Sequence, residues 1–280
     1  MASSVNPRPL VMGIVNVTPD SFSDGGRGVD AAIAHARQLL ADGADILDIG
    51  GESTRPGADP VPADEEIARV VPVIAAIRAE THAPISIDTM KPPVARAAIA
   101  AGATMWNDVT ALSFAPDSAA TAAELGCDVV LMHMRGTPQT MNAEARYDDV
   151  VAEVMAALQA RAEAAMAAGV ARERLWLDPG LGFAKTAEHS LALLRSLDRL
   201  VAQGFPVLLG ASRKSFLKAV DPSATAAEDR LGGSIAAALL GVRAGVAAVR
   251  AHDVRETVQA LKVWETAQPL TAMARTPQPR

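Results

Sequence analysis

Polar and charged residues end a series of short apolar runs in this chain, and together they could form one reactive site. The two carboxylates of this set accept N–H groups, while its lysine donates. Together with the side-chain amide of Asn107, these groups suit the binding of a flat heterocycle that carries amino and oxo groups on its edges. They are equally compatible with a buried ion pair that only joins strands, and single Asp, Asn or Ser residues could be helix N-caps. The set is Asn16, Asp88, Asn107, His133, Asp178, Ser212, Lys214, Arg250 and His252.

A second group of candidates is basic. Arginine forks and loop amides are the usual way to hold a phosphate, so these residues predict a site for a small anion. Three glycine-bearing loops accompany them, namely NVTPDSFSDGG, GGESTRPG and DPGLGFAK. The basic residues are Arg55, Arg213, Lys214, Arg250 and His252.

Several common catalytic signatures are missing. No glycine loop has the P-loop spacing, and GLGFAK holds only the first two glycines of a dinucleotide fingerprint. The serine of GESTRPG fails the G-x-S-x-G pattern, and the five histidines are scattered without an H-E-x-x-H motif. The sequence therefore argues against a nicotinamide enzyme, a serine hydrolase and a zinc site held by protein ligands.

The elements that must position these residues alternate eight times between strand and helix. The apolar runs do not alternate with polar residues, which is typical of parallel strands buried on both faces. Eight such units in about 250 residues favour a single-domain α/β fold, the (β/α)8 barrel, although pattern alone does not exclude an open, doubly wound sheet. Expected strands are 10–15, 45–50, 84–88, 103–107, 128–132, 174–178, 206–210 and 246–250, and expected helices are 29–42, 63–79, 92–101, 118–125, 147–168, 187–203, 230–244 and 254–265.

Composition restricts the class of protein further. The formal net charge is −6, from 26 basic and 32 acidic residues without long blocks of one sign. A nucleic-acid or membrane surface is therefore not expected. A single cysteine, no signal-peptide pattern and no long apolar stretch predict a cytoplasmic protein. We expect a short lead over 1–9, one barrel domain over 10–265 and a disordered tail over 266–280.

Eight motifs, in order along the chain, resemble those of the dihydropteroate synthase family. They are MGIVNVTPDSFSDGG, DIGGESTRPG, ISIDTM, NDV, MHMRGTP, LDPGLGFAK, LLGASRK and VRAHDV. The resemblance implies a (β/α)8 barrel that acts as a homodimer in folate biosynthesis. It also implies a transferase that joins 6-hydroxymethyl-7,8-dihydropterin pyrophosphate to p-aminobenzoate, with Mg²⁺, releasing pyrophosphate.

The resemblance also implies roles for individual residues. It makes Asn16, Asp88, Lys214, Arg250 and His252 catalytic. The pterin would contact Asp88, Asn107, Met132, Asp178, Phe183, Gly210 and Lys214. Pyrophosphate would contact Asn16, Thr54, Arg55, Arg250 and His252, with Ser53 beside them and Asn16 also at the metal. The p-aminobenzoate, whose pocket sulfonamide drugs occupy in this family, would lie among Phe22, Pro56, Phe183 and Ser212.

The long loop after the first strand is interpreted as a lid over the substrates. Its glycines lower the cost of unusual backbone angles, and connections of this kind are mostly only about 2–6 residues long. Two alternatives remain at this point. One is a pterin-binding methyltransferase, which has no use for a pyrophosphate site, and the other is a paralogue that binds pterins without turnover.

Overall fold

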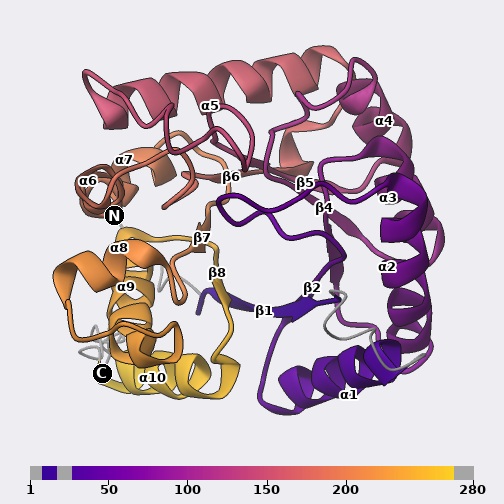
Figure 1. Cartoon of the computed structure of the whole chain (residues 1–280), viewed down its shortest axis with the longest axis horizontal. Coiled ribbons are helices and arrows are strands. Elements are labelled where there is room, and N and C mark those ends of the chain that lie inside the picture. Colours follow the sequence, from indigo (N-terminus) through magenta and orange to yellow (C-terminus); the bar gives the residue numbers. More distant parts are fainter. Residues whose placement is uncertain (1–7, 18–26, 268–280) are drawn as a thin grey trace, which may run out of the picture.

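Eight parallel strands form a nearly closed barrel in the computed structural model, which describes residues 8–17 and 27–267 (Figure 1). The hydrogen-bonded order is β6-β5-β4-β3-β2-β1-β8-β7. A single bridge between Leu177 and Val207 joins β6 to β7 and closes the circle. The predicted (β/α)8 barrel is thus confirmed. The strands are β1 Leu10–Asn16, β2 Ile46–Gly50, β3 Ile85–Asp88, β4 Met105–Asp108, β5 Asp128–Met132, β6 Leu175–Asp178, β7 Leu208–Gly210 and β8 Ala248–Ala251.

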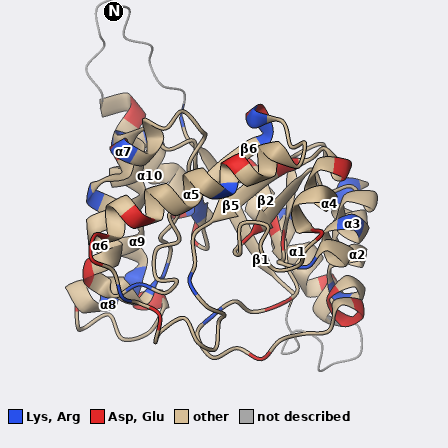
Figure 2. Ribbon diagram, turned by 90° about the horizontal axis from the view of Figure 1, so that it is seen from above, with Lys and Arg blue, Asp and Glu red and all other residues tan. Residues whose placement is uncertain are grey.

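Helices surround the barrel on its outer side (Figure 1). Their inward faces pack on the strands around a large aliphatic core. Among the described residues, no helix combines the length and the hydropathy that a membrane span requires. Acidic and basic positions are interspersed along the outer helices (Figure 2). The helices are α1 Arg27–Ala41, α2 Ala63–Arg78, α3 Pro92–Ala100, α4 Ser118–Leu125, α5 Val150–Ala167, α6 Ala187–Arg195, α7 Leu197–Val201, α8 Ser215–Val220, α9 Leu231–Ala244 and α10 Val254–Ala267.

The helices differ from the sequence prediction in number and, by up to three residues, at several of their ends. The single helix predicted over 187–203 is wrong, because the backbone breaks at Ser196 (φ −111°, ψ 19°) and separates α6 from α7. The short helix α8 was not predicted. Helix α10 continues through Ala267, two residues into the predicted tail, and residues 268–280 lie outside the described part.

Inside the barrel, an apolar layer lies beneath a polar one. Every second residue of a strand faces the inside of the barrel. The residue two positions after each member of the apolar layer therefore also faces inward, and on β2, β4, β6 and β8 this residue is polar or charged. The apolar layer comprises Met12, Ile46, Met105, Val130, Trp176, Leu208 and Ala248, and the layer above includes Asp48, Asn107, Met132, Asp178, Gly210 and Arg250.

The loop after β4 is held in an unusual conformation. Ala111 and Leu112 have φ values of 52° and 60°, in the left-handed region that non-glycine residues seldom occupy. Arg161 of α5 donates hydrogen bonds to both of their carbonyl oxygens, at 2.7 Å each. The Asp108 carboxylate accepts from the amides of Thr110 and Leu112 at 2.8 Å, while burial raises its pKa to about 6. The loop is therefore fixed from both sides.

We expect Gly180→Ala, in the loop after β6, to destabilise the fold by about 2 kcal/mol or more. Gly180 has φ +65°, and an added Cβ would lie 2.1 Å from the carbonyl oxygen of His133. Gly126→Ala is the matched control, since Gly126 has φ +58° but open space around its Cβ position. Urea unfolding measures both free energies, and equal losses would contradict the steric argument.

Candidate active site

The carboxyl ends of neighbouring strands bring several predicted site residues together. The parallel register places Asn16 opposite Gly50, Gly50 opposite Asp88, and Asp88 opposite Asn107. On the other side of the barrel, Gly210 pairs with Arg250. These positions all lie at the end of the barrel where the βα loops begin, which is the usual site of activity in this fold.

Arg250 spans two carboxylates within this end of the barrel, the fully buried Asp48 and the mostly buried Asp88. Its Nε donates to Asp48 Oδ2 at 2.6 Å, and its Nη2 donates to Asp88 Oδ2 at 2.8 Å. Asn107 donates from Nδ2 to the same Asp48 oxygen at 3.2 Å. Asp48 was missed by the sequence analysis, although a carboxylate inside the apolar run DILDIG could have indicated it.

The surroundings of Asp88 raise the pKa of its carboxyl group. Burial raises its pKa to about 7, and the nearby Asp48 charge adds to that rise, while the Arg250 guanidinium opposes it. One of its oxygens, Oδ1, is buried with no hydrogen-bond partner among the described residues. An unpaired buried acceptor costs free energy, so this oxygen is available to a donor from a ligand.

Two further charged side chains, Asp178 and Lys214, lie on either side of the space above Gly210 without a direct ion pair between them among the described residues. A methyl group at Gly210 would lie 3.6 Å from both Asp178 Oδ2 and Lys214 Nζ. Burial raises the pKa of Asp178, with Lys214 opposing the rise, and burial lowers the pKa of Lys214 to about 8. Lys214 Nζ also lies 4.8 Å from the centre of the Phe183 ring. The absence of a side chain at Gly210 keeps the space beside both charges open.

An apolar wall adjoins these charges. Phe183 and Met134 pack as partly buried residues against a small buried cluster. The cluster is distinct from the main core and includes the predicted residue Met132. A flat ring could therefore lie on an apolar surface while its edges face charged groups. The buried cluster is Met90, Val109 and Met132.

His252 and Ser212 are in contact, as Ser212 Oγ lies 3.0 Å from His252 Nδ1. The same hydroxyl accepts from the His252 backbone N–H at 3.1 Å. Burial lowers the pKa of His252 to about 4, and the charges of Arg250, Arg213 and Arg55 lower it further. The ring is therefore neutral at pH 7.

Arg213 differs from the other basic candidates. Its guanidinium donates two hydrogen bonds to Asp253, at 3.0 and 2.5 Å, and lies 3.6 Å from Glu228. Its backbone φ is 58°, and Ser234 binds its amide. This side chain holds the β7 and β8 loops together, and its donors are already occupied.

The loop after β2 carries Thr54, Arg55 and Pro56. Thr54 is partly buried, whereas Arg55 and Pro56 are exposed. The loop is tied across to the β5 loop, because Gly57 donates to the Pro138 carbonyl at 2.9 Å. Its base is held by Lys91, which bonds Glu52 at 2.7 Å and Glu66 at 2.5 Å in the interior. The motif GGESTRPG thus contains its own anchoring acid, which sequence reasoning missed.

Two predicted residues at the first strand remain without described contacts. The side chain of Asn16 is exposed at the end of β1. Phe22 and most of the expected lid, residues 18–26, lie outside the described residues. Within the described part of the chain, no three His, Cys, Asp or Glu residues gather to hold a metal.

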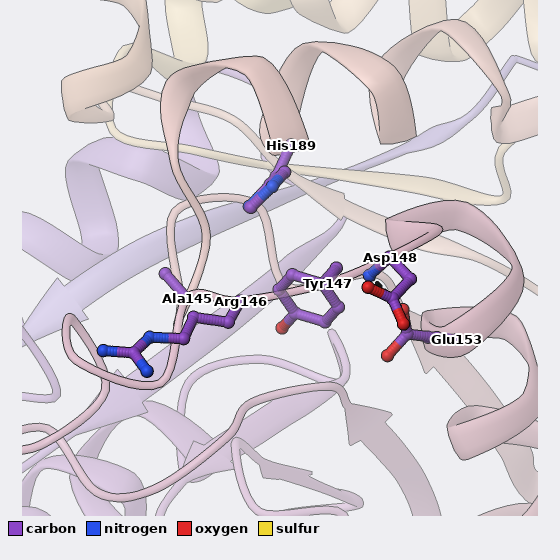
Figure 3. A pocket seen from close by; sticks show the side chains of 6 residues that line it. All are labelled: Ala145, Arg146, Tyr147, Asp148, Glu153 and His189. Carbon is purple, nitrogen blue, oxygen red and sulfur yellow. Dashed lines mark hydrogen bonds between the residues drawn. The ribbon is translucent and has the colours of Figure 1, made fainter.

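A separate pocket of about 340 Å³ lies between the N-terminal ends of α5 and α6 (Figure 3). It contains none of the predicted site residues. Tyr147 and His189 meet edge to face in it, with ring centres 5.1 Å apart. The other lining residues are Ala145, Arg146, Asp148 and Glu153.

We expect the stability of the wild-type chain to fall relative to Asp88→Asn between about pH 4 and pH 7. The folded state holds the Asp88 proton more tightly, with a pKa of about 7 against an ordinary 3.8. That stabilisation is complete below the lower value and is lost as the pH rises through the higher one, by about 1 kcal/mol per pH unit. Urea unfolding at several pH values measures the slope. A difference that does not vary with pH would contradict the assignment.

Comparison with known proteins agrees with this geometry. A family model described as pterin binding enzyme matches residues 12–252. Dihydropteroate synthases of Neisseria meningitidis serogroup B and Escherichia coli are 50% and 46% identical, each covering 92% of this chain, and 92% and 91% of the relatives. A Xanthomonas albilineans dihydropteroate synthase structure with 4-aminobenzoic acid is 51% identical, with TM-score 0.88 and 94% of both chains covered. Another, in complex with 7,8-dihydropteroate, is 45% identical with TM-score 0.84, again covering 94% of both chains. The chain therefore belongs to the dihydropteroate synthase family of pterin-binding enzymes.

Proposed function

We propose that this chain condenses 6-hydroxymethyl-7,8-dihydropterin pyrophosphate with p-aminobenzoate to give 7,8-dihydropteroate and pyrophosphate. The observation that carries the proposal is the polar layer inside the mouth of the barrel. There, Asp88 and Asn107 end neighbouring strands, Asp178 and Lys214 lie beside Gly210, and an apolar wall adjoins Lys214. Such an arrangement matches a flat ring with donor and acceptor edges.

The pterin would bind among Asp88, Asn107, Asp178 and Lys214. The unpaired Oδ1 of Asp88 would accept an N–H group from the ring. Lys214 would donate to a ring acceptor, and Met132 and Phe183 would pack on the ring face. The contact to Asp88 Oδ1 would supply the partner that this buried oxygen lacks among the described residues.

The pyrophosphate would bind beside Arg250 and His252, with Thr54 and Arg55 approaching from the β2 loop. Among the described residues, the Nη1 group of Arg250 has no hydrogen-bond partner, so it remains free to donate to an anion. The neutral His252 ring would donate its N–H group to the same anion. Arg250 would thus bridge the pterin carboxylate and the leaving group.

Magnesium fits this site as an ion held mainly by the diphosphate. Asn16 would supply one oxygen ligand at the end of β1, and Mg²⁺ commonly keeps several waters and binds through substrate phosphates. When bound, the ion would neutralise charge that develops on the leaving diphosphate oxygen.

The reaction exchanges one bond to the methylene carbon of the pterin for another. The C–O bond breaks, and its electron pair leaves with the diphosphate. The amine nitrogen of p-aminobenzoate then forms the C–N bond and loses a proton. Asp88 and Asp178 would stabilise positive charge on the pterin during this exchange, and no enzyme nucleophile is required. Pro56, Phe183, Ser212 and Phe22 would surround the arylamine.

We also propose that the enzyme is a cytoplasmic homodimer. Leu240 on α9 and Val263 on α10 are 39% and 63% exposed, and these two helices pack side by side. Val220 on α8 is 62% exposed. A second copy would cover these apolar side chains, and the homodimer is what the family resemblance implies.

The activity is tested by supplying the pterin pyrophosphate, Mg²⁺ and p-aminobenzoate to the purified chain. We expect 7,8-dihydropteroate to form, together with pyrophosphate release that depends on the arylamine. Chromatography of the product and an assay of pyrophosphate measure both. Folded protein that binds pterin without turnover would favour the non-catalytic paralogue, and methyl transfer instead would favour the methyltransferase.

Lys214→Met should weaken pterin binding by about 1.5–3 kcal/mol, because a buried charged donor to the ring is lost. Calorimetric titration with 6-hydroxymethyl-7,8-dihydropterin gives the affinity. Lys218→Met is the matched control, since Lys218 is exposed on the neighbouring helix α8. An unchanged affinity in the Lys214 variant would mean that this amine does not contact the ring.

A further inference from the structure

The loop after β6 carries Asp178 and Phe183, and a buried lysine holds its far end. Lys185 is 9% exposed, and its Nζ lies 3.0 Å from His133 Nδ1. The same nitrogen donates to the carbonyl oxygens of His133, at 3.1 Å, and of Phe183, at 2.9 Å. The three hydrogens of the ammonium thus match three acceptors, which belong to the end of β5 and to the β6 loop.

This lysine is costly for the fold. Burial lowers its pKa to about 7, with Lys214 and Arg135 lowering it further and Asp178 opposing them. Among the described residues, no carboxylate forms an ion pair with it. A buried cation without an acidic partner contributes little to stability compared with an apolar side chain. Its contacts instead determine where the Phe183 backbone lies.

A second contact holds the next peptide unit of the same loop. The Tyr147 hydroxyl donates to the Ala184 carbonyl oxygen at 3.0 Å, and Ala184 has a left-handed φ of 48°. Tyr147 lies against His189 (Figure 3). The Arg135 guanidinium also lies 3.9 Å from the centre of its ring. The Phe183 carbonyl is therefore fixed by Lys185 of the same loop, which also bonds His133 at the end of β5, and the Ala184 carbonyl is fixed by Tyr147 from the segment after β5.

These hydrogen bonds to the loop backbone determine the position of the Phe183 ring. It packs against the cluster that contains Met132, and it lies 4.8 Å from Lys214 Nζ. We propose that Lys185 and Tyr147 are positioning residues, which set the affinity for the pterin and the arylamine by fixing the Phe183 ring. The proposal rests on the function proposed above. The diphosphate side of the site, at Arg250 and His252, is on other strands and should not depend on them.

The test compares binding of two separate probes to the full chain. We expect Lys185→Met to raise the Kd for 6-hydroxymethyl-7,8-dihydropterin about tenfold and Tyr147→Phe to raise it about threefold, as hydrogen bonds of ordinary strength are lost. The Kd for pyrophosphate with Mg²⁺ should stay within about twofold of wild type, because its donors are not moved. Lys262→Met, at an exposed lysine on α10, is the control for removal of a charge.

Each outcome decides between roles. An unchanged pterin affinity in folded Lys185→Met and Tyr147→Phe overturns the positioning role. Equal weakening of pterin and pyrophosphate also overturns it, since that result indicates general disorder of the site. If Lys185→Met does not fold, Tyr147→Phe decides alone, because it removes one oxygen atom. Wild-type protein that binds no pterin would overturn the proposed function itself, and wild-type binding with unaffected variants would not.

Discussion

The ion pairs of Arg250 with Asp48 and Asp88 are the interaction on which the rest of the site depends. They connect β8 to β2 and β3 across the inside of the barrel. Without the guanidinium, two carboxylates of low solvent exposure would lie close together with no neutralising charge. Their repulsion and desolvation would destabilise the fold. Asn107 joins the same network through Asp48. One cation therefore orients Asp88 directly and Asn107 through Asp48, two of the groups that we assign to pterin recognition.

The charged groups of the site have pKa values that differ from their ordinary values. Burial raises the pKa values of Asp88 and Asp178 and lowers those of Lys214 and Lys185. Such opposed shifts in one small region cost stability, and they are more typical of functional sites than of structural ion pairs. The alternative that these residues merely join strands accounts for the contacts of Arg250, but not for the unpaired oxygen of Asp88.

Rigid strands and cross-linked loops share the task of positioning the site. The parallel register of β3, β4 and β6 determines where their side chains lie. The loops after β2, β4 and β6 are each joined by hydrogen bonds to another segment of the chain. Examples are Gly57 with Pro138, Arg161 with Leu112, and Tyr147 with Ala184. These ties explain how exposed segments can present Arg55 or Phe183 to a ligand with small positional error.

The sequence by itself determined the alternation of eight strands and eight main helical segments, and it predicted which residues end the strands. Those features follow from local apolar patterning and from motifs, which need no knowledge of distant contacts. Only the tertiary structure decided that Asp48 pairs with Arg250, that Lys185 contacts His133, and that Arg213 bonds Asp253. It also decided the break at Ser196 and the left-handed turn at Ala111. These features arise where residues far apart in the chain meet, and burial there, rather than residue type, sets each group's charge and partners.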